Sequence, residues 1–129
     1  MADVDRDGKP DIITIVGKEG PVWYHNPDWK AHPVTTKLGL HDIEVADFDG
    51  DDDVDIIGRN QNWSEKTSGA TLFLLRQETP ERWTRAEFPI PNGEGLKAAD
   101  IDGDGDLDIV INSVWLENPR GSTMLPLSP

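Results

Sequence analysis

The sequence has no cysteine, no long hydrophobic run and few basic residues. Without cysteine there is no disulfide framework, no thiol chemistry and no thiolate zinc site. No apolar stretch is long enough to span a bilayer as a helix, and no signal-peptide pattern precedes Asp3. These absences leave both an intracellular protein and an exported bacterial protein open, because a mature exported chain would look the same.

The charge balance is strongly acidic. The 129 residues include 12 Lys and Arg and 25 Asp and Glu, which gives a net charge of −13. Such a surface argues against nucleic acid and anionic membranes as partners. More than half of the acidic residues fall in three short stretches, which points to localised cation sites. The length suits one domain with a modest core.

The three acidic stretches share the pattern D-x-D-x-D-[G/D]-x-x-D and cover residues 3–11, 47–55 and 100–108. Carboxylates at loop positions 1, 3 and 5 repel one another unless a cation lies among their oxygens. Calcium, a hard cation that takes six to eight oxygen ligands, fits this donor set best. A solvated acidic turn is the alternative for any single loop, but three copies in one frame favour calcium.

We predict that the side chains at loop positions 1, 3, 5 and 9 and the carbonyl oxygen at position 7 bind two to three calcium ions per chain. The predicted ligands are Asp3, Asp5, Asp7, Lys9 and Asp11 in loop 1, Asp47, Asp49, Asp51, Asp53 and Asp55 in loop 2, and Asp100, Asp102, Asp104, Asp106 and Asp108 in loop 3. Position 6 must turn sharply, which suits Gly8 and Gly105. Asp52 stands there in loop 2, and Asp tolerates a positive φ better than most residues.

The loops are not EF-hands, which need a Glu at position 12 and a helix beyond it. Position 12 is Thr14, Gly58 and Ile111, and β-branched runs follow each loop, so each loop should join two strands. Strands are predicted within residues 11–17, 22–25, 29–38, 41–46, 55–58, 71–75, 82–88, 96–99, 108–112 and 114–117. The first strand of the first repeat is nearly missing.

Residues 120–129 have two prolines and no strand pattern, which indicates a mobile tail or a docking arm.

Together with Trp23-Tyr-His-Asn-Pro27 and Trp115-Leu-Glu-Asn-Pro119, these loops resemble the FG-GAP/VCBS repeat. This repeat is the blade unit of calcium-binding β-propellers such as the integrin α-subunit head. The resemblance covers residues 1 to about 119 and implies an all-β fold of four-stranded antiparallel blades. It also implies mostly structural calcium and a location that is extracellular, periplasmic or at the cell surface. Repeat starts 44 and 53 residues apart suit such blades.

The expected organisation is blade 1 at residues 1–40, blade 2 at 41–93, partial blade 3 at 94–119 and a C-terminal tail at 120–129. Closed propellers need at least four blades, so two and a half to three blades per chain leave open sheet edges. We therefore expect copies of the chain to close one propeller together, most simply as a symmetric dimer. The rival is that the chain is a piece of a longer protein.

Candidate ligand contacts lie in the polar insertion after the second strand of blade 2. Arg59, Asn60, Asn62 and Trp63 combine an aromatic ring, amides and a guanidinium, a composition typical of glycan or protein contacts. His41 begins an inner strand, near the expected propeller axis. The alternatives are a loop anchor for Trp63 and an ordinary polar role for His41. His25 and His32 have no partner that the sequence identifies.

The other tryptophans, Trp23, Trp29, Trp83 and Trp115, are expected to fill the spaces between blades. No nucleophile elbow, phosphate loop or His-based metal motif occurs. The sequence therefore favours a non-catalytic, calcium-stabilised propeller module for binding or adhesion. The alternatives are a part of a carbohydrate-active enzyme, similar to a polysaccharide lyase, and a structural remnant that binds only calcium.

Overall fold

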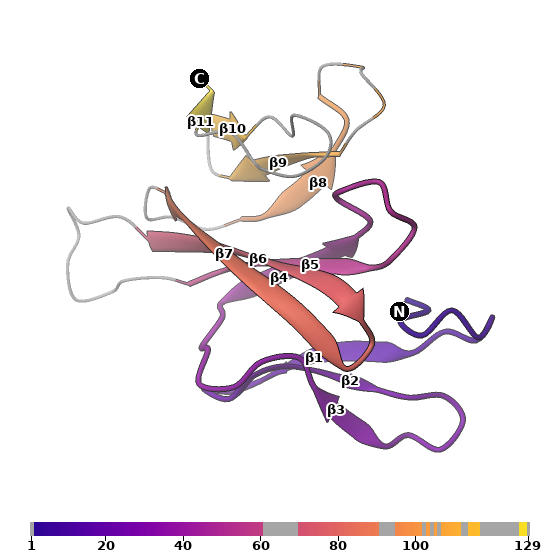
Figure 1. Cartoon of the computed structure of the whole chain (residues 1–129). Coiled ribbons are helices and arrows are strands. Elements are labelled where there is room, and N and C mark those ends of the chain that lie inside the picture. The colour runs from indigo at the N-terminus through magenta and orange to yellow at the C-terminus, as the bar shows by residue number, and fades with distance from the viewer. Residues whose placement is uncertain are drawn as a thin grey trace.

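The computed structural model describes residues 2–60, 70–90, 95–101, 103, 105, 107–111, 114–116 and 127–128. Within these ranges every regular element is a β-strand, and the strands form three antiparallel sheets. The sheets are stacked on one another in chain order, with the first at the bottom and the third at the top of Figure 1. The expected all-β fold of blade-type antiparallel sheets is confirmed.

Sheet 1 contains β1 (Ile12–Val16), β2 (Gly20–Tyr24) and β3 (Ala31–Pro33) in that spatial order. The segment before loop 1 contributes only an isolated bridge, in which Ala2 and Asp11 exchange backbone hydrogen bonds of 3.1 and 2.7 Å. β1 is therefore an edge strand of this sheet, and most of its outer backbone faces no strand among the described residues.

Sheet 2 is a four-stranded sheet. It contains β4 (Asp42–Ala46), β5 (Asp55–Arg59), β6 (Ala70–Thr79) and β7 (Arg82–Ile90), each paired with the next. β6 and β7 extend beyond the predicted ranges, and their register shifts between Gln77 and Thr79. The β6–β7 hairpin is consequently the longest ladder of the described chain.

Sheet 3 contains β8 (Lys97–Ala99), β9 (Asp108–Ile111), β10 (Val114–Leu116) and β11 (Leu127–Ser128). β11 pairs with β10 and completes four strands, so the expectation that the tail contributes no strand is wrong for these two residues. Backbone pairing needs no hydrophobic alternation along the strand. Pattern alone therefore could not reveal β11.

The core lies on both faces of sheet 2. One cluster joins sheet 2 to sheet 3 and includes Phe48, Ile57, Leu72, Leu74, Ile109 and Ile111. The other joins sheet 2 to sheet 1 and includes Val4, Trp23, Val34, Ile56, Phe73 and Leu75. Successive side chains of a strand point to opposite faces. The continuous apolar run of β6 therefore supplies both clusters, as expected of a strand buried on both sides.

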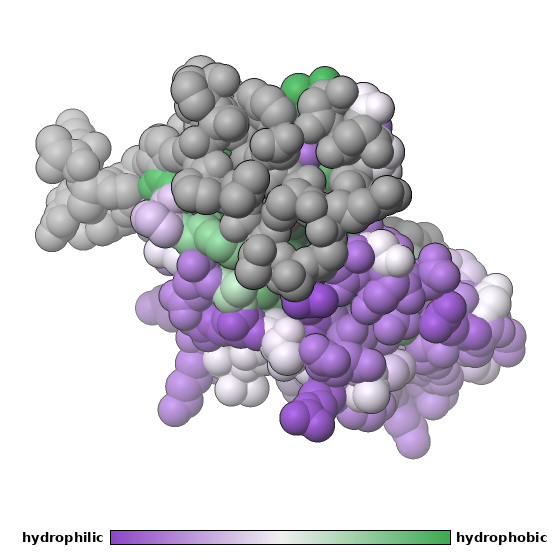
Figure 2. Space-filling view, turned by 45° about the horizontal axis from the view of Figure 1, so that its top comes forward, coloured by the Kyte–Doolittle hydropathy of each residue, from purple (hydrophilic) through white to green (hydrophobic). Residues whose placement is uncertain are grey.

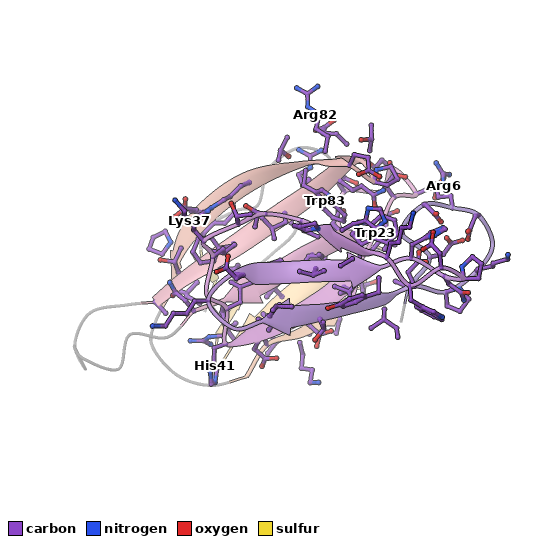
Figure 3. The ribbon with its side chains drawn as sticks, turned by 90° about the horizontal axis from the view of Figure 1, so that it is seen from below. Arg6, Trp23, Lys37, His41, Arg82 and Trp83 are labelled. Carbon is purple, nitrogen blue, oxygen red and sulfur yellow. The ribbon has the colours of Figure 1, made fainter. Side chains whose placement is uncertain are left out.

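Trp23 fills the junction of sheets 1 and 2 with 2% of its surface exposed. Its indole Nε1 donates to the Pro80 carbonyl at 3.3 Å, and Trp83 Nε1 donates to the same oxygen at 3.1 Å. Figure 3 shows the two rings close together between the sheets. The inter-sheet role is confirmed for these two residues. The predicted inter-sheet role is wrong for Trp29, which has φ of 56° and is 46% exposed. The Trp115 side chain lies outside the described residues.

Candidate metal centres

The three acidic loops lie together at one end of the stacked sheets. Loop 1 reaches loop 2 through an ion pair of 3.5 Å between Arg6 Nη1 and Asp53 Oδ1. Loops 2 and 3 share a cavity of about 470 Å³, lined by Asp47, Phe48, Asp49, Gly50, Asp52, Gly105 and Leu107. Each loop enters the strand after it at the same place in its sheet, so stacking the sheets brings the loops side by side.

The position-1 carboxylate organises each loop by accepting hydrogen bonds from the backbone that turns around it. Asp47 accepts from the N–H groups of Gly50 at 2.8 Å and Asp52 at 2.9 Å. In loop 1, Asp3 accepts from the equivalent Gly8 N–H at 2.8 Å. In loop 3, Asp100 accepts from Gly103 and Gly105 at 2.8 and 2.9 Å. The described parts of the three loops therefore share one conformation.

The position-9 carboxylates Asp11, Asp55 and Asp108 are fully buried. Asp55 accepts from the Phe48 N–H and from the Gln77 N–H at the end of β6, both at 3.0 Å. Asp11 repeats this arrangement with Val4 at 2.8 Å and Asn26 at 2.9 Å. In loops 1 and 2, position 9 therefore ties the start of the loop to the end of the second strand after it, β2 or β6. The sequence predicted a ligand there but gave no sign of this structural role.

Two positions in each loop require a positive φ. Position 6 has φ of 87° at Gly8, 72° at Asp52 and 92° at Gly105, so the predicted turn and the tolerance of Asp for it are confirmed. Position 4 is also left-handed, with φ of 62° at Arg6 and 75–78° at the two glycines of the other loops. The glycines at position 4 of loops 2 and 3 were the signal for this second turn.

The predicted metal ligands converge. In loop 2, Asp47, Asp49, Asp51 and Asp55 each offer an oxygen, and these oxygens all lie within 4.8 Å of one another. Asp3, Asp5 and Asp7 do the same in loop 1. An all-oxygen, multiply charged donor set of this size fits calcium. Asp102, Asp104 and Asp106 lie outside the described residues, and the carbonyl role of Lys9 and Asp53 stays a prediction.

Without a cation the loop 2 carboxylates are electrostatically strained. Burial raises the pKa of Asp55 to about 7, and burial together with the neighbouring acids raises the pKa of Asp51. Burial also acts to raise the pKa of Asp49, but hydrogen bonds involving Asp51 and Arg76 outweigh it and lower that pKa. Asp51 and Asp55 thus hold their protons more readily than an ordinary Asp does. A divalent cation among the oxygens would reverse this preference.

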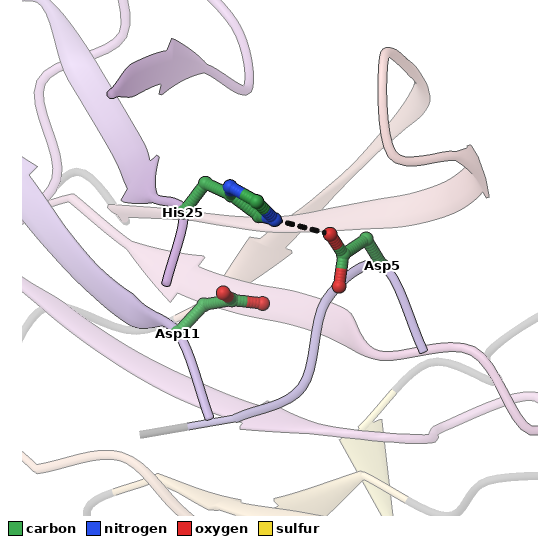
Figure 4. Close-up of side chains that lie close together, drawn as sticks. All are labelled: Asp5, Asp11 and His25. Atoms are coloured by element: carbon green, nitrogen blue, oxygen red, sulfur yellow. Dashed lines mark ion pairs between the residues drawn. The ribbon is translucent and has the colours of Figure 1, made fainter. Parts of the chain in front are cut away.

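Each of loops 1 and 2 also has a basic partner on the second strand after the loop: His25 directly follows β2, and Arg76 lies in β6. His25 Nε2 lies 2.8 Å from Asp5 Oδ2 (Figure 4). The same nitrogen lies 3.4 Å from Asp7 Oδ2. The His25 Nδ1 atom faces Asp28 Oδ1 at 3.1 Å, and this hydrogen bond raises the pKa of His25. The sequence identified no partner for His25, because the loop and the strand end are brought together only by folding.

In loop 2 the basic partner is Arg76. Its Nε and Nη2 atoms donate to Asp49 Oδ2 at 3.0 and 2.8 Å. This residue was not among the predicted site residues. The sequence did not reveal that Arg76 is equivalent to His25, because Arg76 lies 21 residues after Asp55 whereas His25 lies 14 residues after Asp11.

The described candidates for ligand contact, His41, Arg59 and Asn60, lie at the end of sheet 2 away from loop 2. His41 is exposed and lies at the opposite end of the sheets from Arg6 in Figure 3. Arg59 is fully buried, and its Nη1 donates to the Gly95 carbonyl at 3.1 Å. Its role as a ligand contact stays a prediction. Asn60 Oδ1 accepts a hydrogen bond from the Thr71 N–H at 2.7 Å. This bond links the end of β5 to the start of β6. Asn62 and Trp63 lie outside the described residues.

The coloured surface in Figure 2 is mainly hydrophilic, with hydrophobic atoms confined to small areas. In the part of the chain that the structure describes, no helix has the length and apolarity to cross a membrane.

Comparison with known proteins gives one match. Residues 3–58, which include loops 1 and 2 and the strands around them, match the family model of the FG-GAP-like repeat. No curated protein and no solved structure matches the chain. The matched segment starts at the first carboxylate of loop 1 and ends within β5, so it contains two complete copies of the acidic loop. The match supports an FG-GAP-type repeat over residues 3–58.

Proposed function

We propose that the chain is a calcium-stabilised, non-catalytic β-propeller module for binding or adhesion. The observation that carries the proposal is the convergence of four carboxylates in loop 2, whose oxygens lie within 4.8 Å of one another. Asp55 among them is fully buried, and burial of an ionised carboxylate is costly without a compensating charge. Calcium would supply that charge.

The role of the ions is structural. Asp11 and Asp55 already join the loop start to the end of the second strand after the loop, so an ion held by either would fasten three segments of one blade. Binding to the folded chain alone converts the binding free energy of the ion into folding free energy. Loop 2 offers four carboxylates plus backbone oxygens, and such a saturated set leaves no open position for a reacting group.

The number of bound ions tests the proposal. We expect equilibrium dialysis of the full chain against calcium to give two to three ions per chain, because each acidic loop would hold one. Asp49→Ala removes a converging carboxylate and should lose one ion. Asp28→Ala removes an acid of the same type outside the ligand sets and should leave the number unchanged. Equal losses in the two variants would refute the assignment of the loops.

The binding partner would be a glycan or a protein, and the location extracellular, periplasmic or at the cell surface, in keeping with the repeat family. Support comes from the acidic surface, which disfavours nucleic acid and anionic membranes. A glycan array followed by analysis of the products separates this function from catalysis. Binding without product formation is the expected result.

We further propose that copies of the chain assemble to complete the propeller, most simply as a dimer. β1 is an edge strand, and its Ile12 and Val16 side chains are each 40% exposed. Unpaired edges with apolar side chains favour pairing with another chain. Gel filtration with light scattering in calcium should give twice the mass of one chain. A stable monomer under the same conditions would refute this assembly.

A further inference from the structure

His25 and Arg76 occupy equivalent places in sheets 1 and 2. Ile12 is the first residue after loop 1, and it pairs with Tyr24 in β2. Ile56 is the first residue after loop 2, and it pairs with Leu75 in β6. The next residue along the chain is His25 after Tyr24 and Arg76 after Leu75. Both lie at 2.8 Å from the Oδ2 atom of the position-3 carboxylate of their loop.

The two side chains differ in what they can do at that oxygen. Arg76 donates from both Nε and Nη2 to Asp49 Oδ2, and the Asp49 side chain is only 8% exposed. A guanidinium stays charged and has no lone pair to offer a metal. An imidazole reaches its carboxylate with a single nitrogen, His25 Nε2 at 2.8 Å from Asp5 Oδ2. The guanidinium therefore makes two hydrogen bonds to one ligand oxygen of loop 2, whereas the imidazole can make only one to its oxygen in loop 1.

We propose that Arg76 is an internal competitor of calcium in loop 2. The residue at this place on the second strand after each loop, His25 or Arg76, then determines the order in which the loops bind calcium. Loop 1 binds calcium more tightly than loop 2. This inference rests on the proposed calcium function and adds a residue that sets the affinity. Two geometric features support it, the paired hydrogen bonds to one oxygen and the burial of that carboxylate. The charge of the guanidinium supplies the physical effect, since it repels a divalent ion that approaches Asp49.

Calorimetric calcium titration of the chelator-stripped full chain tests the inference. The parent should show sites of unequal affinity. Arg76→Gln should strengthen the weaker site by roughly tenfold or more, because a unit charge a few ångströms from a divalent ion repels it even in a water-like dielectric. Arg82→Gln is the matched control: Arg82 is exposed on the neighbouring strand, so the same charge change there should alter affinity less than about twofold.

The reciprocal variant His25→Arg should weaken the tighter site, and it keeps the inference testable if Arg76→Gln does not fold. An Arg76→Gln titration that matches the parent, or that is weaker, overturns the inference. So does a His25→Arg titration identical to that of the parent. Calcium uptake by the parent with either of those results leaves the proposed function intact, whereas no uptake by the parent overturns both.

Discussion

Removal of calcium with EDTA is expected to lower the melting temperature of the chain by about 10 °C. Extracellular modules bind calcium with dissociation constants on the order of 0.1–1 mM, so 10 mM calcium adds roughly 1.4–2.7 kcal/mol per site. Two sites together give about 3–5 kcal/mol, and each kcal/mol shifts the midpoint of a domain of this size by a few degrees. Differential scanning calorimetry in 10 mM calcium and in EDTA measures the shift.

Magnesium provides the control for this experiment. It demands a compact octahedral shell and gives up its water reluctantly, so it should restore much less of the melting temperature than calcium at the same concentration. Identical melting curves in EDTA and in calcium would contradict structural binding of the ion.

The size of the EDTA effect should also depend on pH. Burial raises the pKa of Asp55 from its ordinary value of 3.8 to about 7 in the metal-free fold. Between these values the folded chain holds a proton that the unfolded chain has lost, so Asp55 makes the metal-free protein less stable as the pH rises from about 4 to 7. Calcium binds the ionised form, and the stabilisation by calcium should therefore be larger at pH 8 than at pH 5. The opposite order would contradict a role for Asp55 as a ligand.

Trp23→Ala is expected to destabilise the chain by about 3–5 kcal/mol, the usual cost of replacing a buried Trp by Ala. Trp23 is 2% exposed, and its ring stacks on His32 with 4.4 Å between the ring centroids. The substitution would open a cavity between sheets 1 and 2 and free the Pro80 carbonyl of one donor. Urea denaturation in saturating calcium measures the loss.

Trp29→Ala is the matched control, because it removes the same side chain from a position that is 46% exposed. Its free energy of unfolding should stay within about 0.5 kcal/mol of the parent, as is usual for surface substitutions. Trp23→Phe should lie between the two, since it keeps most of the packing but cannot donate to Pro80. Equal effects of Trp23→Ala and Trp29→Ala would contradict the assignment of Trp23 to the inter-sheet core.

Much of the fold follows from local signals. The three loops share a pattern dense in carboxylates and turn residues, and β-branched runs follow each of them, so loops and adjoining strands could be predicted together. The apolar run Leu72–Leu75 also indicated a strand buried on both faces. The positive φ of Asp52 was predictable because the glycines at the same position of the other loops show what the turn requires.

Other features depend on contacts between segments that lie far apart in the chain. Arg59 looked like a surface residue beside a polar loop, yet it is fully buried and donates to the carbonyl of Gly95, which precedes β8. Arg76 and Asp49 are 27 residues apart and meet only when β6 pairs with β5. Trp29 matched Trp83 by its place in the repeat, but the short β3 begins after it. Repeat alignment predicts which residues are equivalent, whereas their burial depends on how complete each sheet is.

A crystal structure of the full chain grown in calcium tests the central claim most directly. The account predicts one ion in each acidic loop, with oxygen atoms of Asp47, Asp49 and Asp51 about 2.3–2.6 Å from the ion in loop 2. Loops 1 and 2 that contain only water at a saturating calcium concentration would contradict it.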